Sequence, residues 1–190
     1  MSAMRHLPLV VLTLLALQAP ALAQTQLELN FQAKDKAMAA DKVLNQRYKQ
    51  VMGRLGSADR TQLTKAELAW IKFRDAECTH EEDQYRGGSM AQMIYWQTYQ
   101  RLTELRAQGL EAAVGPAGAA ADRKLNAIYQ AWDKEQDPAA HKLLQQAELA
   151  WIAFRDAEAA RFKDRAGAVA RLSNERAHDL KVLLDERRSH

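Results

Sequence analysis

Residues 66–77 read AELAWIKFRDAE, and residues 147–158 read AELAWIAFRDAE. The two stretches differ at one position, where the first has Lys72 and the second has Ala153. Neither contains Gly or Pro, and both are rich in Ala, Leu and Glu, so both are predicted to be helical. We call these two stretches the keystone segments, because the rest of the chain repeats around them.

The spacing within a keystone segment puts its aromatic residues on one side of the helix. Ala66, Trp70, Phe73 and Glu77 follow each other at intervals of four, three and four residues. A core-facing Trp–Phe seam explains this pattern, whereas an ion pair or hydrogen-bonded cap would explain why the Arg and the acids also recur. Arg74 and Glu77 are three residues apart, within reach on one helix face. The predicted structural motif therefore consists of Trp70, Phe73, Arg74, Asp75, Glu77, Trp151, Phe154, Arg155, Asp156 and Glu158.

The composition favours an all-α globular protein. Apolar residues make up 47% of the 190-residue chain and charged residues 27%, with only eight Gly and four Pro. The formal net charge of +3 is too small, without a clustered basic stripe, to predict a nucleic-acid partner.

The N-terminus has the pattern of a secretory signal peptide. Arg5 precedes an apolar run over residues 7–17, and Ala21-Leu22-Ala23 provides the small residues of a cleavage site after Ala23. The run is too short to anchor the chain in a bilayer, and no other stretch is apolar enough to span one. No Cys stands at the cleavage site, so we expect a soluble protein, periplasmic or secreted, without a lipid anchor.

Cys78 is the only cysteine, so no intramolecular disulfide can form. In an oxidising compartment such a residue is either buried and inert or paired with another chain. Its place on the keystone helix favours burial.

Further motifs show that the whole pattern is duplicated. The sequence AD-x-x-LN-x-x-Y occurs at residues 40–48 and 121–129, with the same 81-residue offset as the keystone segments. The sequence RL-T/S-x-x-RA occurs at residues 101–107 and 171–177, where the offset is only 70 residues. The second copy is therefore shorter by 11 residues between its keystone segment and its third helix.

We predict two tandem three-helix units that form a helical bundle. Residues 1–23 are the signal peptide, 24–114 the first unit, 115–118 a Gly-Pro-Ala-Gly linker and 119–190 the shorter second unit. The expected helices of the first unit cover residues 25–52, 57–85 and 89–110, with Ser57 and Ser89 as candidate N-caps. In the second unit, Asp137-Pro138 has the pattern of an N-cap followed by an N1 proline.

These motifs resemble the lysozyme-inhibitor LprI-like N-terminal domain family, which consists of small exported bacterial helical proteins. The match is good over residues 30–111, and the second copy lacks the Gly-Gly-Ser turn. The resemblance implies an all-α fold and an inhibitor function. It is carried by Leu44, Asn45, Tyr48, Trp70, Phe73, Arg74, Asp75, Cys78, Gly87, Gly88, Ile94, Tyr95, Arg101, Leu102 and Thr103.

Two positions depart from the family pattern. Members often have further cysteines, and Gln32 and Thr98 occupy the corresponding positions here. The disulfide bracing that the resemblance would imply is absent, so we expect burial between helices to replace it.

Nothing in the sequence predicts an enzyme, a cofactor or a metal site. No hydrolase, metalloprotease, P-loop or dinucleotide fingerprint is present. Cys78, His80, Glu81 and Glu82 do not have the spacing of a zinc site, so a solvated acidic helix face is the expected structure.

The segment unique to the first copy is the predicted partner-binding element. Lysozymes are cationic, and acidic residues could complement such a surface beside a Gly-Gly turn, whose backbone can approach a partner closely. The candidate contact residues are Glu81, Glu82, Asp83, Tyr85, Gly87, Gly88 and Ser89. The predicted function is protein binding, with inhibition of lysozyme or a related muramidase, and the expected partner is lysozyme or another cationic protein. The alternative is an envelope scaffold or assembly factor that binds a different protein through exposed Trp and Tyr.

Overall fold

The computed structural model describes residues 18–111 and 120–189. Within them the chain forms α-helices and no strand, which confirms the all-α class. None of the helices in these residues is long and apolar enough to cross a membrane. The predicted signal peptide lies mostly outside the described residues, as does the predicted linker. The helices are α2 (Gln18–Arg54), α3 (Ser57–Asp83), α4 (Ala91–Gly109), α5 (Ala120–Asp133), α6 (Pro138–Ala159) and α7 (Arg165–Arg188).

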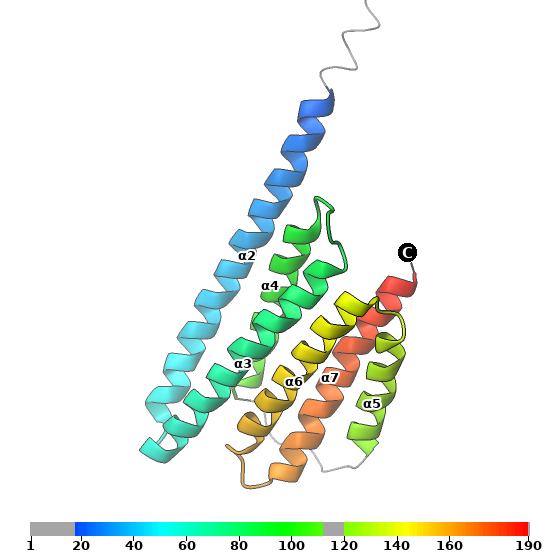
Figure 1. Cartoon of the computed structure of the whole chain (residues 1–190). Coiled ribbons are helices and arrows are strands. Elements are labelled where there is room, and N and C mark those ends of the chain that lie inside the picture. The colour runs from blue at the N-terminus through cyan, green and yellow to red at the C-terminus, as the bar shows by residue number, and fades with distance from the viewer. Residues whose placement is uncertain (1–17, 112–119, 190) are drawn as a thin grey trace, which may run out of the picture.

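The two units pack through their keystone helices. Within the first unit, α2 and α3 both pack on α4; within the second, α5 and α6 both pack on α7. Helices α3 and α6 lie side by side at the centre of the bundle, with α2 and α5 at its two outer edges (Figure 1). Each unit therefore leaves its first helix only weakly packed against its second.

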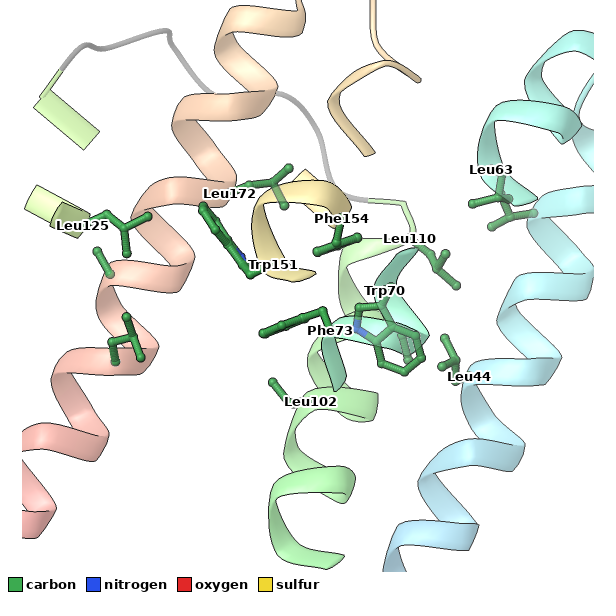
Figure 2. Close-up of a cluster of buried hydrophobic side chains, with 14 residues drawn as sticks. Leu44, Leu63, Trp70, Phe73, Leu102, Leu110, Leu125, Trp151, Phe154 and Leu172 are labelled. Atoms are coloured by element: carbon green, nitrogen blue, oxygen red, sulfur yellow. The ribbon is translucent and has the colours of Figure 1, made fainter. Parts of the chain in front are cut away.

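The keystone aromatic residues form the centre of the core. Trp70 and Trp151 are each only 3% exposed, which confirms the predicted seam. Phe73 and Phe154, which occupy the same position in the two repeats, stack with ring centroids 6.2 Å apart and planes 2° apart. Figure 2 shows these two rings between the units, with Trp70 on the side of Leu44 and Trp151 on the opposite side. Contact between equivalent residues indicates an approximate two-fold relation between the units.

One helix start is as predicted and two are not. The Asp137 carboxylate accepts hydrogen bonds from the backbone N–H groups of Ala139 and Ala140, both at 2.9 Å, and Pro138 begins α6. The N-cap of α3 is Gly56 rather than Ser57, and that of α4 is Met90 rather than Ser89. Neither of these caps is made by a side chain, so the serine signals were wrong: Ser57 is already in the helix, and Ser89 belongs to the preceding turn.

Candidate functional site

The keystone arginines bind the acid that follows them. Arg74 donates to Asp75 Oδ1 at 3.0 and 2.8 Å, and Arg155 donates to Asp156 Oδ1 at 3.0 and 2.9 Å. Each guanidinium also lies over the Trp of its own keystone helix. The recurrent Arg and Asp thus cap the Trp in both units. Arg74 does not pair with Glu77, although their spacing on the helix would allow it.

Glu77 instead binds an arginine from the other unit. Arg176 of α7 donates to its two carboxylate oxygens at 2.7 and 2.9 Å, and both side chains are buried. Burial alone would raise the pKa of the Glu77 carboxyl, but the charge and hydrogen bonds of Arg176 outweigh it and hold the pKa below the ordinary value.

An equivalent ion pair joins an arginine of the first unit to an acid of the second unit. Arg106 of α4 lies 3.0 Å from the buried carboxylate of Glu158, which is the counterpart of Glu77. Each arginine also contacts a second acid in its own unit: Arg106 donates to Glu67 at 2.9 Å, and Arg176 donates to Glu148 at 3.3 Å. These reciprocal pairs explain why the acids recur in the repeat, and they make the motif residues structural.

The lone cysteine is buried and free, as its place on the keystone helix predicts. The Cys78 side chain has no solvent exposure, and this burial raises the pKa of its thiol.

The acidic run at the end of α3 is not a solvated face throughout. His80 is fully buried and Glu81 is 7% exposed, so the expectation of a solvated face is wrong for both, whereas Glu77, predicted on the side of Trp70 and Phe73, is fully buried. Glu81 lies against the buried ring of His80, with Oε1 3.3 Å from Nδ1. His80 is on the side of α3 that turns toward the second unit, where its ring packs near Trp132. The sequence alone did not predict that this face of α3 is buried, because a run of acidic residues is ordinarily exposed to solvent.

The other two acids of this run, Asp83 and Glu82, differ in whether a neighbouring arginine neutralises their charge. Asp83 is half-buried and accepts two hydrogen bonds from Arg86, at 2.8 and 2.5 Å, which lower the pKa of the Asp83 carboxyl. Glu82 is also half-buried, and it has no ion-pair partner among the described residues. Glu82 is therefore the acid of this run whose charge is available to a partner.

The turn after α3 is exposed and has a defined shape. Gly87 has φ of +80°, a conformation that glycine adopts without strain. The Gly88 N–H donates to the Tyr85 carbonyl at 2.9 Å, and a Cβ on Gly88 would lie only 3.1 Å from that oxygen. Tyr85 and Met90 flank the glycines, and both are more than 40% exposed. The turn presents two apolar side chains on a backbone that requires its glycines.

The second unit holds this turn in place. Gln84 donates to Gln136 at 3.0 Å, and Arg86 lies 3.7 Å from Asp137, the N-cap of α6. The sequence identified Asp137 only as a cap, so its second contact was missed. We call residues 82–90 the α3–α4 turn. It is exposed, contacts both units and has no equivalent in the shorter second copy.

Two other expectations concern metals and exposed aromatic residues. In the described ranges, no group of three or more His, Cys, Asp and Glu side chains is placed to hold a metal ion. The scaffold alternative called for exposed Trp and Tyr, and Tyr85 is 43% exposed. Trp70, Trp132 and Trp151 are buried and Trp96 is half-buried, so no described Trp is exposed.

Comparison with known proteins places the chain in a family. The sequence model of the family described as "Lysozyme inhibitor LprI" matches residues 18–110 and again residues 108–180. The chain belongs to the lysozyme inhibitor LprI family. The two matches coincide with the two units, and the keystone segments and AD-x-x-LN-x-x-Y motifs described above occur once in each LprI match.

The individual relatives give information about the fold but not about an activity. An uncharacterized protein of Rhizobium meliloti (strain 1021) is 31% identical over 102 residues, covering 47% of this chain and 73% of that protein. The crystal structure of an uncharacterized protein from Burkholderia thailandensis has a TM-score of 0.55 at 18% identity, covering 83% of each chain. This likeness shows a shared helical fold for the LprI chain described here.

Proposed function

We propose that this protein is an exported inhibitor of a lysozyme or a related muramidase, and that it acts by binding the enzyme. The observation that carries the proposal is the match of both units to the LprI family. The signal-like N-terminus supports export to the periplasm or the medium, where lysozymes act.

The α3–α4 turn is the proposed contact element. Tyr85 supplies a large amphipathic side chain on a rigid backbone, so little conformational entropy is lost when it is buried by a partner. Glu82 adds a negative charge that no described residue neutralises, which suits a cationic enzyme. Asp83, Gly87, Gly88 and Ser89 shape the turn, and buried Glu81 supports it from behind rather than touching the partner.

A lysis assay tests the function. Purified chain beginning at Gln24 is added to bacterial cell walls with each of several lysozyme types, and clearing of turbidity is followed. We expect inhibition of at least one type. If none is inhibited at protein concentrations well above the enzyme concentration, the proposal is wrong.

Variants test the contact element. Tyr85→Ala should weaken inhibition about tenfold, the loss expected for a binding hot spot. Glu82→Lys should weaken it most at low salt, because salt screens an exposed charge. Val182→Ala is the control, since Val182 is 41% exposed and Tyr85 is 43% exposed, but Val182 lies on α7, outside residues 82–90. Equal effects of Tyr85→Ala and Val182→Ala would argue against the turn.

A further inference from the structure

A groove separates α2 from α3 in the first unit. Its volume is about 190 Å³. That is smaller than the usual site for a drug-sized ligand and comparable to one long side chain. Leu44 and Trp70 are buried beneath it, while Leu68 on its rim is 59% exposed. Residues from the helix that carries the Leu-Asn-x-x-Tyr motif and from the keystone helix meet here: Asp41, Asn45, Tyr48, Leu68, Ile71 and Arg74.

The second unit has most of the same residue types at the corresponding positions of α5 and α6, although Thr64 of the groove lining corresponds to Gln145. For each of the six groove residues named above, the residue 81 positions later in the chain is of the same type. The counterparts are Asp122, Asn126, Tyr129, Leu149, Ile152 and Arg155. The charged contact is also repeated, because Arg74 lies 3.8 Å from Asp41 and Arg155 lies 4.0 Å from Asp122.

Two exposed neighbours on the same helices differ between the copies, whereas exposed Asp75 is kept as Asp156. Val43 corresponds to Lys124, and Lys72 corresponds to Ala153. Leu149, the counterpart of Leu68, is 67% exposed. An exposed leucine adds little to folding stability, so stability does not explain why both copies keep it. Retention of apolar rim residues among diverged surface positions points to a partner.

The charges in the groove indicate what it would accept. Asp41 and Glu67 contribute two carboxylates and Arg74 one guanidinium, whose hydrogen bonds go to Asp75. Glu67 is paired with Arg106 behind it. Asp41 accepts hydrogen bonds from the Tyr99 hydroxyl at 3.1 Å and the Asn45 amide at 2.8 Å; the Arg74 guanidinium lies 3.8 Å away without a hydrogen bond to it, and the Asp41 side chain remains 32% exposed. A cation with an aliphatic stem is complementary to this carboxylate beside Leu68 and Ile71.

We propose that each unit binds, in this groove, the side chain of a lysine or arginine from a basic partner protein. The aliphatic stem lies on Leu68 and Ile71, or on Leu149 and Ile152, and the cationic head bonds to Asp41 or Asp122. The chain thus has two equivalent side-chain sites in addition to the single α3–α4 turn. Only the identity of the partner as a lysozyme rests on the function proposed above.

A small probe tests the groove without any lysozyme. The ¹⁵N-labelled full mature chain is titrated with n-butylguanidinium and followed by the side-chain amide resonances of Asn45 and Asn126. Saturable shifts at both amides are expected, with n-butanesulfonate, which has the same stem and the opposite charge, giving none. Shifts spread over the surface, or equal shifts with the sulfonate, would overturn the proposal.

Variants separate the two units. Asp41→Asn keeps the side-chain size and should weaken the Asn45 response about tenfold while leaving the Asn126 response unchanged. Asp122→Asn should do the reverse. Leu68→Ser removes an exposed side chain without a folding cost and should weaken only the first site. If both aspartate variants bind the probe like the parent chain, the assignment of the cation is wrong.

The lysis assay then distinguishes this proposal from the proposed function. Probe binding without inhibition of any lysozyme would support the groove proposal and contradict the proposed function. Inhibition of a lysozyme without saturable probe binding would support the proposed function and contradict the groove proposal.

Discussion

Removal of the guanidinium of Arg176 should be among the most damaging single changes in the chain. Its side chain is 1% exposed, and it binds Glu77, which is fully buried, at 2.7 and 2.9 Å. Arg176→Met keeps the apolar stem but leaves the Glu77 carboxylate buried without its main cation. Breaking a buried pair in this way costs about 3–5 kcal/mol. Since domains are stable by only about 5–15 kcal/mol, the variant should unfold at much lower denaturant.

Urea melts followed by circular dichroism measure this loss. Lys181→Met is the matched control, because Lys181 on the same helix pairs with Asp185 at 2.6 Å while both are more than half exposed. The control should lose less than about 1 kcal/mol. A double variant, Arg176→Met with Glu77→Met, removes the buried Glu77 charge as well and should recover part of the stability, because Glu148, which Arg176 also contacts, keeps its charge. The reasoning is refuted if Arg176→Met loses no more than the control, or if the double variant is less stable than the single one.

Four further outcomes are expected. Trp70→Ala and Trp151→Ala should each lose about 3–5 kcal/mol in denaturant melts, and a loss below about 1 kcal/mol would mean that the ring does not stabilise the core. Cys78 should not react with a thiol reagent until the protein is unfolded, because burial both shields the thiol and raises its pKa; rapid labelling of the native protein would contradict this. The folded-state pKa of Glu77 lies below its ordinary value of 4.5, so its contribution to stability is present above about pH 4.5 and is lost as the pH falls below that value. Melts between pH 3 and 7 should show this loss, and Glu77→Gln should reduce it. Gly87→Ala should cost about 1–2 kcal/mol, because φ of +80° is strained for alanine; an unchanged melting curve would show that the turn can relax.

The helices and the core could be predicted because their signals are local. The repeated keystone segment, with Trp and Phe at helical spacing, was sufficient to predict that Trp70 and Trp151 are buried at equivalent positions. The 81-residue offset was sufficient to predict the duplication. Both predictions depend on periodicity within one helix, which survives whatever the helix packs against.

The partners across the units could not be predicted, because they depend on how α3 meets α6. Glu77 and Arg176 are 99 residues apart in the chain, and no local pattern connects them. The same contact explains why His80 was misplaced on a solvated surface. An acidic run indicates solvent only when no second unit covers it, and here His80 faces Trp132 of the second unit.

The reciprocal pairing of α3 with α6 also determines how the protein responds to dilution. If the two units were separate chains, the Phe73–Phe154 stack and the crossed arginine pairs would form only above a concentration set by their dissociation constant. On one polypeptide, each unit meets the other at an effective concentration of roughly millimolar, however few molecules are present. The assembled state should therefore persist at nanomolar protein, and unfolding should show one transition whose midpoint does not change with protein concentration.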